Sequence, residues 1–172
     1  METRAGSYPP DLGVLSKGLG AVASMGASRG GRFLPVAADA DGDIAVTMFL
    51  RRGVSGLPWL EAWTLERDGQ DWELLGGGAG TCQFDRLTAR PLAADLGGLA
   101  CTDARGRTRR NTGYGFVSYA HVRVAAEIGS VLAAGRHLTV PGHGHLAIVW
   151  ASRLPGVTLV GHDRQHLATL KL

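Results

Sequence analysis

Apolar and polar residues alternate along several short stretches of this chain, and residues typical of turns separate the stretches. The alternation is clearest in residues 57–76, where Trp59 and Trp63 occupy positions of the same parity, so that both side chains belong to one face of an extended strand. Asp68-Gly69 follows, a pair that tolerates the positive φ of a hairpin turn, and the alternation then resumes. The pattern predicts a β-hairpin across residues 57–76.

The same pattern recurs before and after this hairpin. We expect further strands over residues 33–38, 44–50, 116–125, 128–132, 137–140, 145–151, 157–161 and 167–172. Short strands at this spacing, joined by turns and without helical crossovers, are typical of two antiparallel sheets packed face to face. The sequence therefore predicts an all-β fold, an antiparallel β-sandwich. The strand spacing of the C-terminal half is immunoglobulin-like, without the Cys and Trp signature of antibody domains.

Two regions interrupt the alternation. Residues 77–115 are rich in glycine and arginine, and only residues 90–96 within them resemble a short helix. We interpret 77–115 as a long irregular insertion, because loops of that length are usually functional or disordered.

Residues 1–31 space their apolar side chains nearly as a helix does, but several glycines weaken that helix. We expect a flexible or marginally helical N-terminal arm, followed by a single domain over residues 32–172.

Composition supports one globular domain. The 172 residues are 45% hydrophobic and 19% charged, and the 26 glycines favour turns over long helices. No stretch approaches the roughly 20 apolar residues of a membrane span, and no signal peptide is recognisable. We therefore expect a cytoplasmic protein without a membrane span. The two cysteines, Cys82 and Cys101, suit a reducing compartment and are interpreted as inert, buried thiols.

The net charge of +3 is small, and nearly all of the basic residues are arginines. We interpret the excess of arginine as the codon bias of a GC-rich genome. The densest basic cluster consists of Arg105, Arg107, Arg109 and Arg110, with Tyr114 close behind. Arginine binds phosphate or carboxylate groups through paired hydrogen bonds, and a nearby aromatic ring can stack on a base. Because acidic residues elsewhere compensate the charge, nucleic acid is the less favoured partner.

Our leading hypothesis is a non-catalytic binding or assembly module. It would recognise a protein partner, or a second copy of itself, through the loop 98–115 and the N-terminal arm. The sequence contains no phosphate-binding loop and no nucleophile elbow, which makes an enzyme the less favoured class. A scaffold of short strands with one charged excursion is a common arrangement for recognition. A weak nucleic-acid binder that uses the arginine cluster is a further alternative.

Histidines near the C-terminus carry the main catalytic alternative. His143 and His145 are two residues apart, so an extended backbone directs both imidazoles to one side, while His162 and His166 flank the last turn. If the two regions meet, His143, His145 and His162 could bind zinc, with Asp163 as a further ligand. This would make the chain a metal-binding protein or a metal-dependent enzyme. Solvated histidines in surface turns are the simpler explanation, and in that case no cofactor is expected.

Two other clusters have structural explanations. Asp39, Asp41 and Asp43 resemble the start of a calcium-binding loop, but Leu50 occupies the position where such a loop needs a bidentate acidic ligand. A polar hairpin turn accounts for the same residues. The tryptophans fall on the apolar sides of the expected strands, and we interpret them as core or cross-strand packing.

Overall fold

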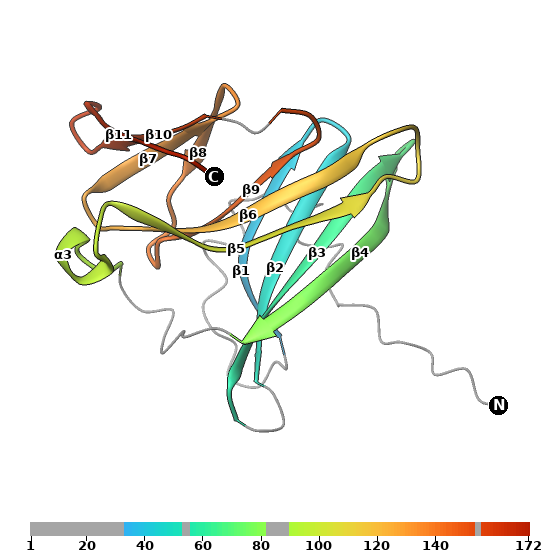
Figure 1. The fold of residues 1–172 in the computed structure, drawn as a ribbon, viewed down its shortest axis with the longest axis horizontal. Helices are drawn as coiled ribbons and strands as arrows, with labels where there is room; N and C mark the ends of the chain where they lie inside the picture. Colours follow the sequence, from blue (N-terminus) through green and yellow to red (C-terminus); the bar gives the residue numbers. More distant parts are fainter. Residues whose placement is uncertain (1–32, 53–55, 82–89, 154–155) are drawn as a thin grey trace.

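The structure is a computed structural model that describes residues 33–52, 56–81, 90–153 and 156–172 (Figure 1). These residues form antiparallel strands and one short helix, so the prediction of an all-β fold is confirmed. In chain order the elements are β1 (Phe33–Asp41), β2 (Ile44–Arg52), β3 (Pro58–Asp68), β4 (Asp71–Thr81), α3 (Ala93–Leu96), β5 (Ala100–Arg109), β6 (Phe116–Val124), β7 (Ile128–Ala133), β8 (Arg136–Thr139), β9 (His145–Trp150), β10 (Val157–Gly161) and β11 (His166–Leu170).

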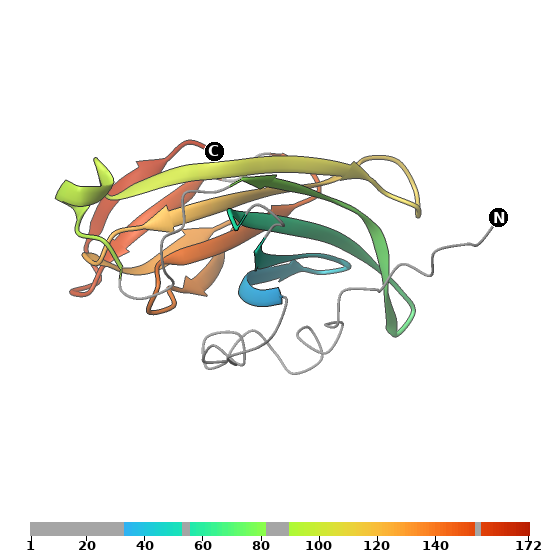
Figure 2. The same ribbon diagram turned by 90° about the horizontal axis from the view of Figure 1, so that it is seen from below.

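The strands are distributed over three sheets rather than the expected two. Their orders are β1-β2-β3-β4, β5-β6-β9 and β11-β10-β7-β8, which we call the first, middle and third sheets. The middle sheet lies against the first one, with β9 beside β1 and β5 beside β4 (Figures 1 and 2). No helix in the described ranges is long and apolar enough to cross a membrane.

Most of β6 and all of β9 are buried on both faces, because these two strands alternate apolar residues toward two separate cores. Val117, Tyr119 and Val149 face the first sheet, where they pack with residues of β1 to β3 such as Met48. The intervening residues, such as Ile148, face the third sheet. Burial of each such side chain contributes about 1.5–3 kcal/mol, so the sheet is fixed from both sides.

An ion pair joins the free edges of β1 and β9. The Val149 N–H donates to Asp39 Oδ2 at 2.8 Å, and Arg136 Nη2 donates to the Val149 carbonyl at 2.9 Å. Arg136 Nη1 also donates to Asp39 Oδ1 at 2.5 Å. The two side chains thus take the place of ladder hydrogen bonds. The polar turn predicted at Gly42 is observed, since β1 and β2 pair as a hairpin around it.

The segment 77–115, expected to be irregular, contains regular structure. It includes the end of β4, helix α3 and all of β5. The alternation of apolar and polar residues is interrupted in β4 and β5 by glycines that lie opposite aromatic residues. Gly77 pairs with Trp63, and Gly106 pairs with Tyr119. A Cβ atom at either glycine would lie 2.5 Å from the opposing ring. Each glycine therefore makes room for an aromatic side chain, and strand and turn glycines look alike in a sequence. The N-terminal arm lies outside the described residues.

Candidate metal centre

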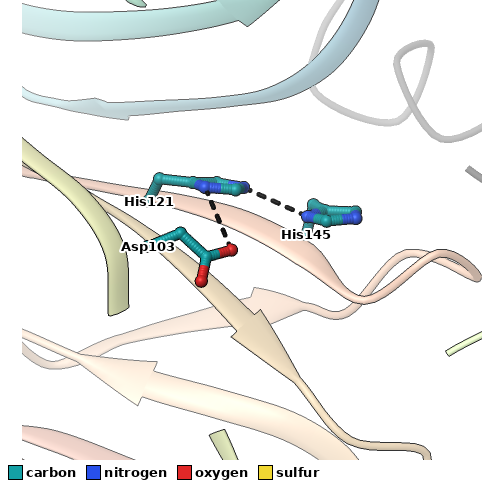
Figure 3. Close-up of side chains that lie close together, drawn as sticks. All are labelled: Asp103, His121 and His145. Atoms are coloured by element: carbon teal, nitrogen blue, oxygen red, sulfur yellow. Dashed lines mark hydrogen bonds and ion pairs between the residues drawn. The ribbon is translucent and has the colours of Figure 1, made fainter. Parts of the chain in front are cut away.

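A β-bulge in β5 places an acidic side chain next to a buried histidine. Thr102 pairs with Val122 and Ala104 pairs with His121, which leaves Asp103 as the extra residue between them. Alternation counted back from Arg105, Arg107 and Arg109 would put Asp103 on the same outward face of β5 as these arginines. The bulge instead turns its carboxylate toward His121 (Figure 3). Bulges commonly re-aim a side chain at a functional site.

His121 and His145 lie on the face of β6 and β9 that packs against the first sheet, as Tyr119 and Val149 do. His121 pairs with Ala147, so His145 is its diagonal neighbour on the same face of the sheet. Both residues are buried, and the distance from His121 Nε2 to His145 Nδ1 is 3.2 Å. His121 Nδ1 lies 3.6 Å from Asp103 Oδ2, and the Asp103 side chain is 36% exposed. The cluster therefore extends from the interior to the surface.

A tight turn before β9 determines where His145 lies. Gly144 has a φ of 76°, its N–H donates to the Pro141 carbonyl, and its carbonyl accepts from the Val124 N–H. A Cβ atom here would lie 2.5 Å from the Val124 carbonyl oxygen, which requires glycine. Just before it, the Nδ1 atom of His143 accepts a hydrogen bond of 3.2 Å from the His145 N–H. The turn is thus a fixed support that also brings the two imidazole rings together, with centroids 5.4 Å apart.

Burial keeps both central histidines neutral. Desolvation lowers the pKa of His121 to about 4; the positive charge of Arg123 also lowers it, whereas Asp103 opposes the shift. Desolvation, together with His121, His143 and Arg123, lowers the pKa of His145 to about 2. Neutral imidazole is the form that binds a metal ion. At neutral pH neither histidine needs to lose a proton to become a ligand.

Asp103, His121 and His145 form the most convincing ligand set among the described residues. Each offers one ligand atom, and these atoms all lie within 4.8 Å of one another. Two imidazole nitrogens and one carboxylate oxygen suit divalent transition metals such as zinc or ferrous iron. With three protein ligands, such an ion keeps at least one coordination position for water or another molecule. We call these three residues the Asp-His-His centre.

Cys101 contacts the centre without belonging to the ligand set. Its thiol donates a hydrogen bond of 3.2 Å to Asp103 Oδ1, the oxygen that does not face His121. Burial and the adjacent Asp103 raise the pKa of Cys101 to about 11. The thiol is therefore protonated at neutral pH, where it orients the carboxylate and is a poor nucleophile. Cys82 lies outside the described residues.

The structure separates the histidines that sequence reasoning grouped together. His145 belongs to the centre and His143 lies beside it, but His162 is exposed and donates to the Ala126 carbonyl at 2.9 Å. His166 contacts Thr169 instead.

Sequence reasoning did not select two residues of the centre as ligands. His121 lies in the strand that the sequence predicts over residues 116–125. Its position after two apolar residues of the same parity, Val117 and Tyr119, indicates the buried face. Asp103 carries no sequence signal, because only the bulge turns it toward His121.

The predicted partner-binding arginines divide into two sets. Arg105, Arg107 and Arg109 occupy alternate, exposed positions of β5, and we call them the arginine stripe. Arg110 instead pairs with Glu66 at 2.5 Å and with Asp43, so it serves the fold.

Two aromatic residues accompany the stripe. Tyr114 is fully exposed in the turn after β5, and Arg107 lies over the ring of Phe116 at 4.7 Å.

No family model, curated protein or solved structure matches this chain. The fold and the site define an all-β protein with a buried histidine pair and one carboxylate.

Proposed function

We propose that this chain is a metal-binding protein whose metal site is the Asp-His-His centre. The observation that carries the proposal is the convergence of three ligand atoms to within 4.8 Å, from residues that lie on three neighbouring strands. His121 and His145 are buried, and the neutral imidazole that burial favours is the form that binds a metal ion. A divalent ion gives the three side chains a common partner. Zinc and ferrous iron fit the donor set best.

Three protein ligands favour a catalytic role over a purely structural one. Structural zinc sites close all four positions with protein side chains, whereas catalytic sites keep one position for water or substrate. The exposed edge of the centre at Asp103 gives that position access to solvent. We therefore propose a metal-dependent enzyme in which the ion acts as a Lewis acid.

The test is metal analysis of untagged protein purified without chelator, followed by titration of the metal-free protein with zinc. We expect one equivalent of bound metal. Asp103→Asn should weaken zinc binding by at least about tenfold, because it removes the only anionic ligand. His162→Ala is the matched control and should bind as the wild type does. Metal-free wild-type protein that also fails to bind added zinc would overturn the proposal, as would equal losses in both variants.

A second candidate is the binding module expected from the sequence. We propose that the arginine stripe, together with Tyr114, recognises an acidic protein partner or a second copy of the chain. The observation in its favour is the alternation that exposes Arg105, Arg107 and Arg109 on one side of a strand at a sheet edge. Guanidinium groups bind carboxylates in paired hydrogen bonds. The immunoglobulin-like strand spacing of the C-terminal half belongs to this proposal and suits recognition by loops at the ends of a sandwich.

The stripe is tested with a poly-glutamate peptide and a single-stranded DNA oligonucleotide as probes. We expect the peptide to bind in a salt-dependent way and to lose binding when the three stripe arginines become glutamine. Arg153→Gln, an exposed arginine away from β5, is the control. Tighter binding of the oligonucleotide would favour the nucleic-acid alternative, and binding of neither probe with a monomeric protein in solution would contradict the proposal.

A further inference from the structure

Positive charge gathers beside the Asp-His-His centre. Arg123 lies on β6 directly opposite Cys101 on β5 and His145 on β9, in the cross-strand row next to that of His121. Because its position has the same parity as His121, its side chain starts from the same face of the sheet. Its charge acts on His121, His145 and Cys101, since it lowers the pKa of all three. Arg123 is therefore an electrostatic neighbour of the whole centre.

Arg123 differs in its partners from Arg90, which donates to the Ile128 carbonyl, and from three partly buried arginines that pair with carboxylates. Arg51 pairs with Glu61, Arg110 with Glu66 and Arg136 with Asp39, each at 2.5 Å.

Arg123 makes no ion pair with any residue of the described ranges. Its buried Nε atom has no hydrogen-bond partner there either. Charged groups at partly buried positions are normally paired, so a cation in this state is suited to an anion from outside the chain.

Metal loading would increase the imbalance. A divalent ion brings two positive charges, of which the single carboxylate of Asp103 compensates one. The two histidines bind a metal ion as neutral imidazoles and compensate none of its charge. The loaded centre together with Arg123 would therefore carry excess positive charge, and the ion would dominate the local field.

On this basis we propose that the open coordination position takes an oxyanion, a carboxylate or a phosphate group, with one oxygen on the metal and another on the Arg123 guanidinium. The inference rests on the proposed metal site. Both groups offer oxygen ligands to a divalent ion, and both match the hydrogen-bonding fork of a guanidinium. The substrate class of the proposed enzyme is accordingly an acid, and Arg123 is the residue that selects it.

The experiment uses the full chain loaded with cobalt(II), whose visible spectrum reports its ligands. Sodium acetate, sodium oxalate and inorganic phosphate are titrated separately, and the order of their affinities distinguishes carboxylate from phosphate recognition. We expect a saturable spectral change with at least one probe. Arg123→Gln should weaken that binding by roughly tenfold to a hundredfold, the effect of a lost charge-assisted hydrogen-bond pair. Its cobalt affinity should stay near that of the wild type.

Arg153→Gln, an exposed arginine beyond the end of β9 that is remote from His145, is the matched control and should leave anion binding unchanged. Arg123→Lys should retain part of the affinity because it keeps the charge and loses the paired geometry. Cobalt binding without any spectral response to the three anions would overturn this inference and leave the metal site standing. Unchanged anion affinity in Arg123→Gln would do the same. Failure of the wild type to bind cobalt would overturn both proposals together.

Discussion

At the residue scale, single backbone positions decide whether the centre can form. Gly144 combines a φ of 76° with a Cβ position 2.5 Å from the Val124 carbonyl oxygen. Gly144→Ala should lower the free energy of unfolding by about 1–3 kcal/mol, through strain and steric overlap. It should also weaken zinc binding, because His145 is the next residue. Urea unfolding and zinc titration measure the two effects.

The control for this substitution lies two residues earlier in the same turn. A Cβ atom at Gly142 would meet no other atom within 4 Å. Gly142→Ala should therefore change stability by less than about 0.5 kcal/mol. Equal effects at the two positions would show that the turn tolerates a side chain and does not fix His145.

Glu66 gives stability a defined pH dependence. Its carboxylate accepts hydrogen bonds from the N–H groups of Asn111 and Thr112, at 2.9 and 3.0 Å, as well as from Arg110. Desolvation raises the pKa of Glu66, but bonds from Thr112, Arg110 and Asn111 outweigh it and lower the pKa from 4.5 to about 2. A carboxyl group with a lowered folded-state pKa stabilises the protein above its unfolded-state pKa. This contribution is lost as the pH falls from about 4.5 toward 2.

We therefore expect the unfolding free energy to decrease between these pH values, and Glu66→Gln to remove part of the decrease. At pH 7 the substitution should cost about 2 kcal/mol, the contribution of hydrogen bonds to a charged acceptor. Urea unfolding across the pH range measures both. Glu73→Gln, an exposed residue of β4, is the control. Parallel pH profiles for the wild type and Glu66→Gln would contradict the assignment.

At the scale of elements, alternation predicted most strands, and their boundaries lie close to those observed. It failed where side chains were missing or displaced. In β4 and β5, glycines stand where rings of the neighbouring strand need the space, so the apolar pattern disappears although the strand continues. In β5 the bulge shifts the parity at Asp103. Both effects arise from the partner strand, which a single-sequence pattern does not contain.

The pairing of Gly77 with Trp63 is testable within one strand. A Cβ atom at Gly77 would lie 2.5 Å from the Trp63 ring and 2.6 Å from the Ala62 carbonyl oxygen, whereas one at Gly78 would meet nothing within 4 Å. Gly77→Ala should lower the unfolding free energy by about 1–3 kcal/mol, the typical cost of overpacking. Gly78→Ala should be close to neutral. Thermal or urea unfolding of both variants measures the difference in stability. A neutral Gly77→Ala would mean that the Trp63 ring moves aside without cost.

At the scale of the whole molecule, the centre depends on sheet order and register. His121 and His145 are 24 positions apart and meet only because β6 pairs with β9, past β7 and β8. The sequence indicated His145 through its spacing from His143, which is a local signal. Asp103 and His121 become ligands through long-range pairing, and His162 is placed elsewhere for the same reason.

The ion pair between Asp39 and Arg136 should affect both stability and the metal site. It connects the first sheet to β9, the strand that carries His145. Asp39 is 1% exposed, so removing Arg136 leaves a buried carboxylate without its cation. Arg136→Met should cost about 3–5 kcal/mol of unfolding free energy. Asp39→Leu combined with Arg136→Met should cost less than the two single changes added together, because no buried charge then remains unpaired. Urea unfolding of the four proteins completes the double-mutant cycle, and additive losses would show that the two side chains act independently.

The same ion pair should also affect zinc binding. If the two edges are joined through this pair, Arg136→Met should weaken zinc binding by His145 although it touches no ligand, whereas Arg153→Gln should leave it unchanged.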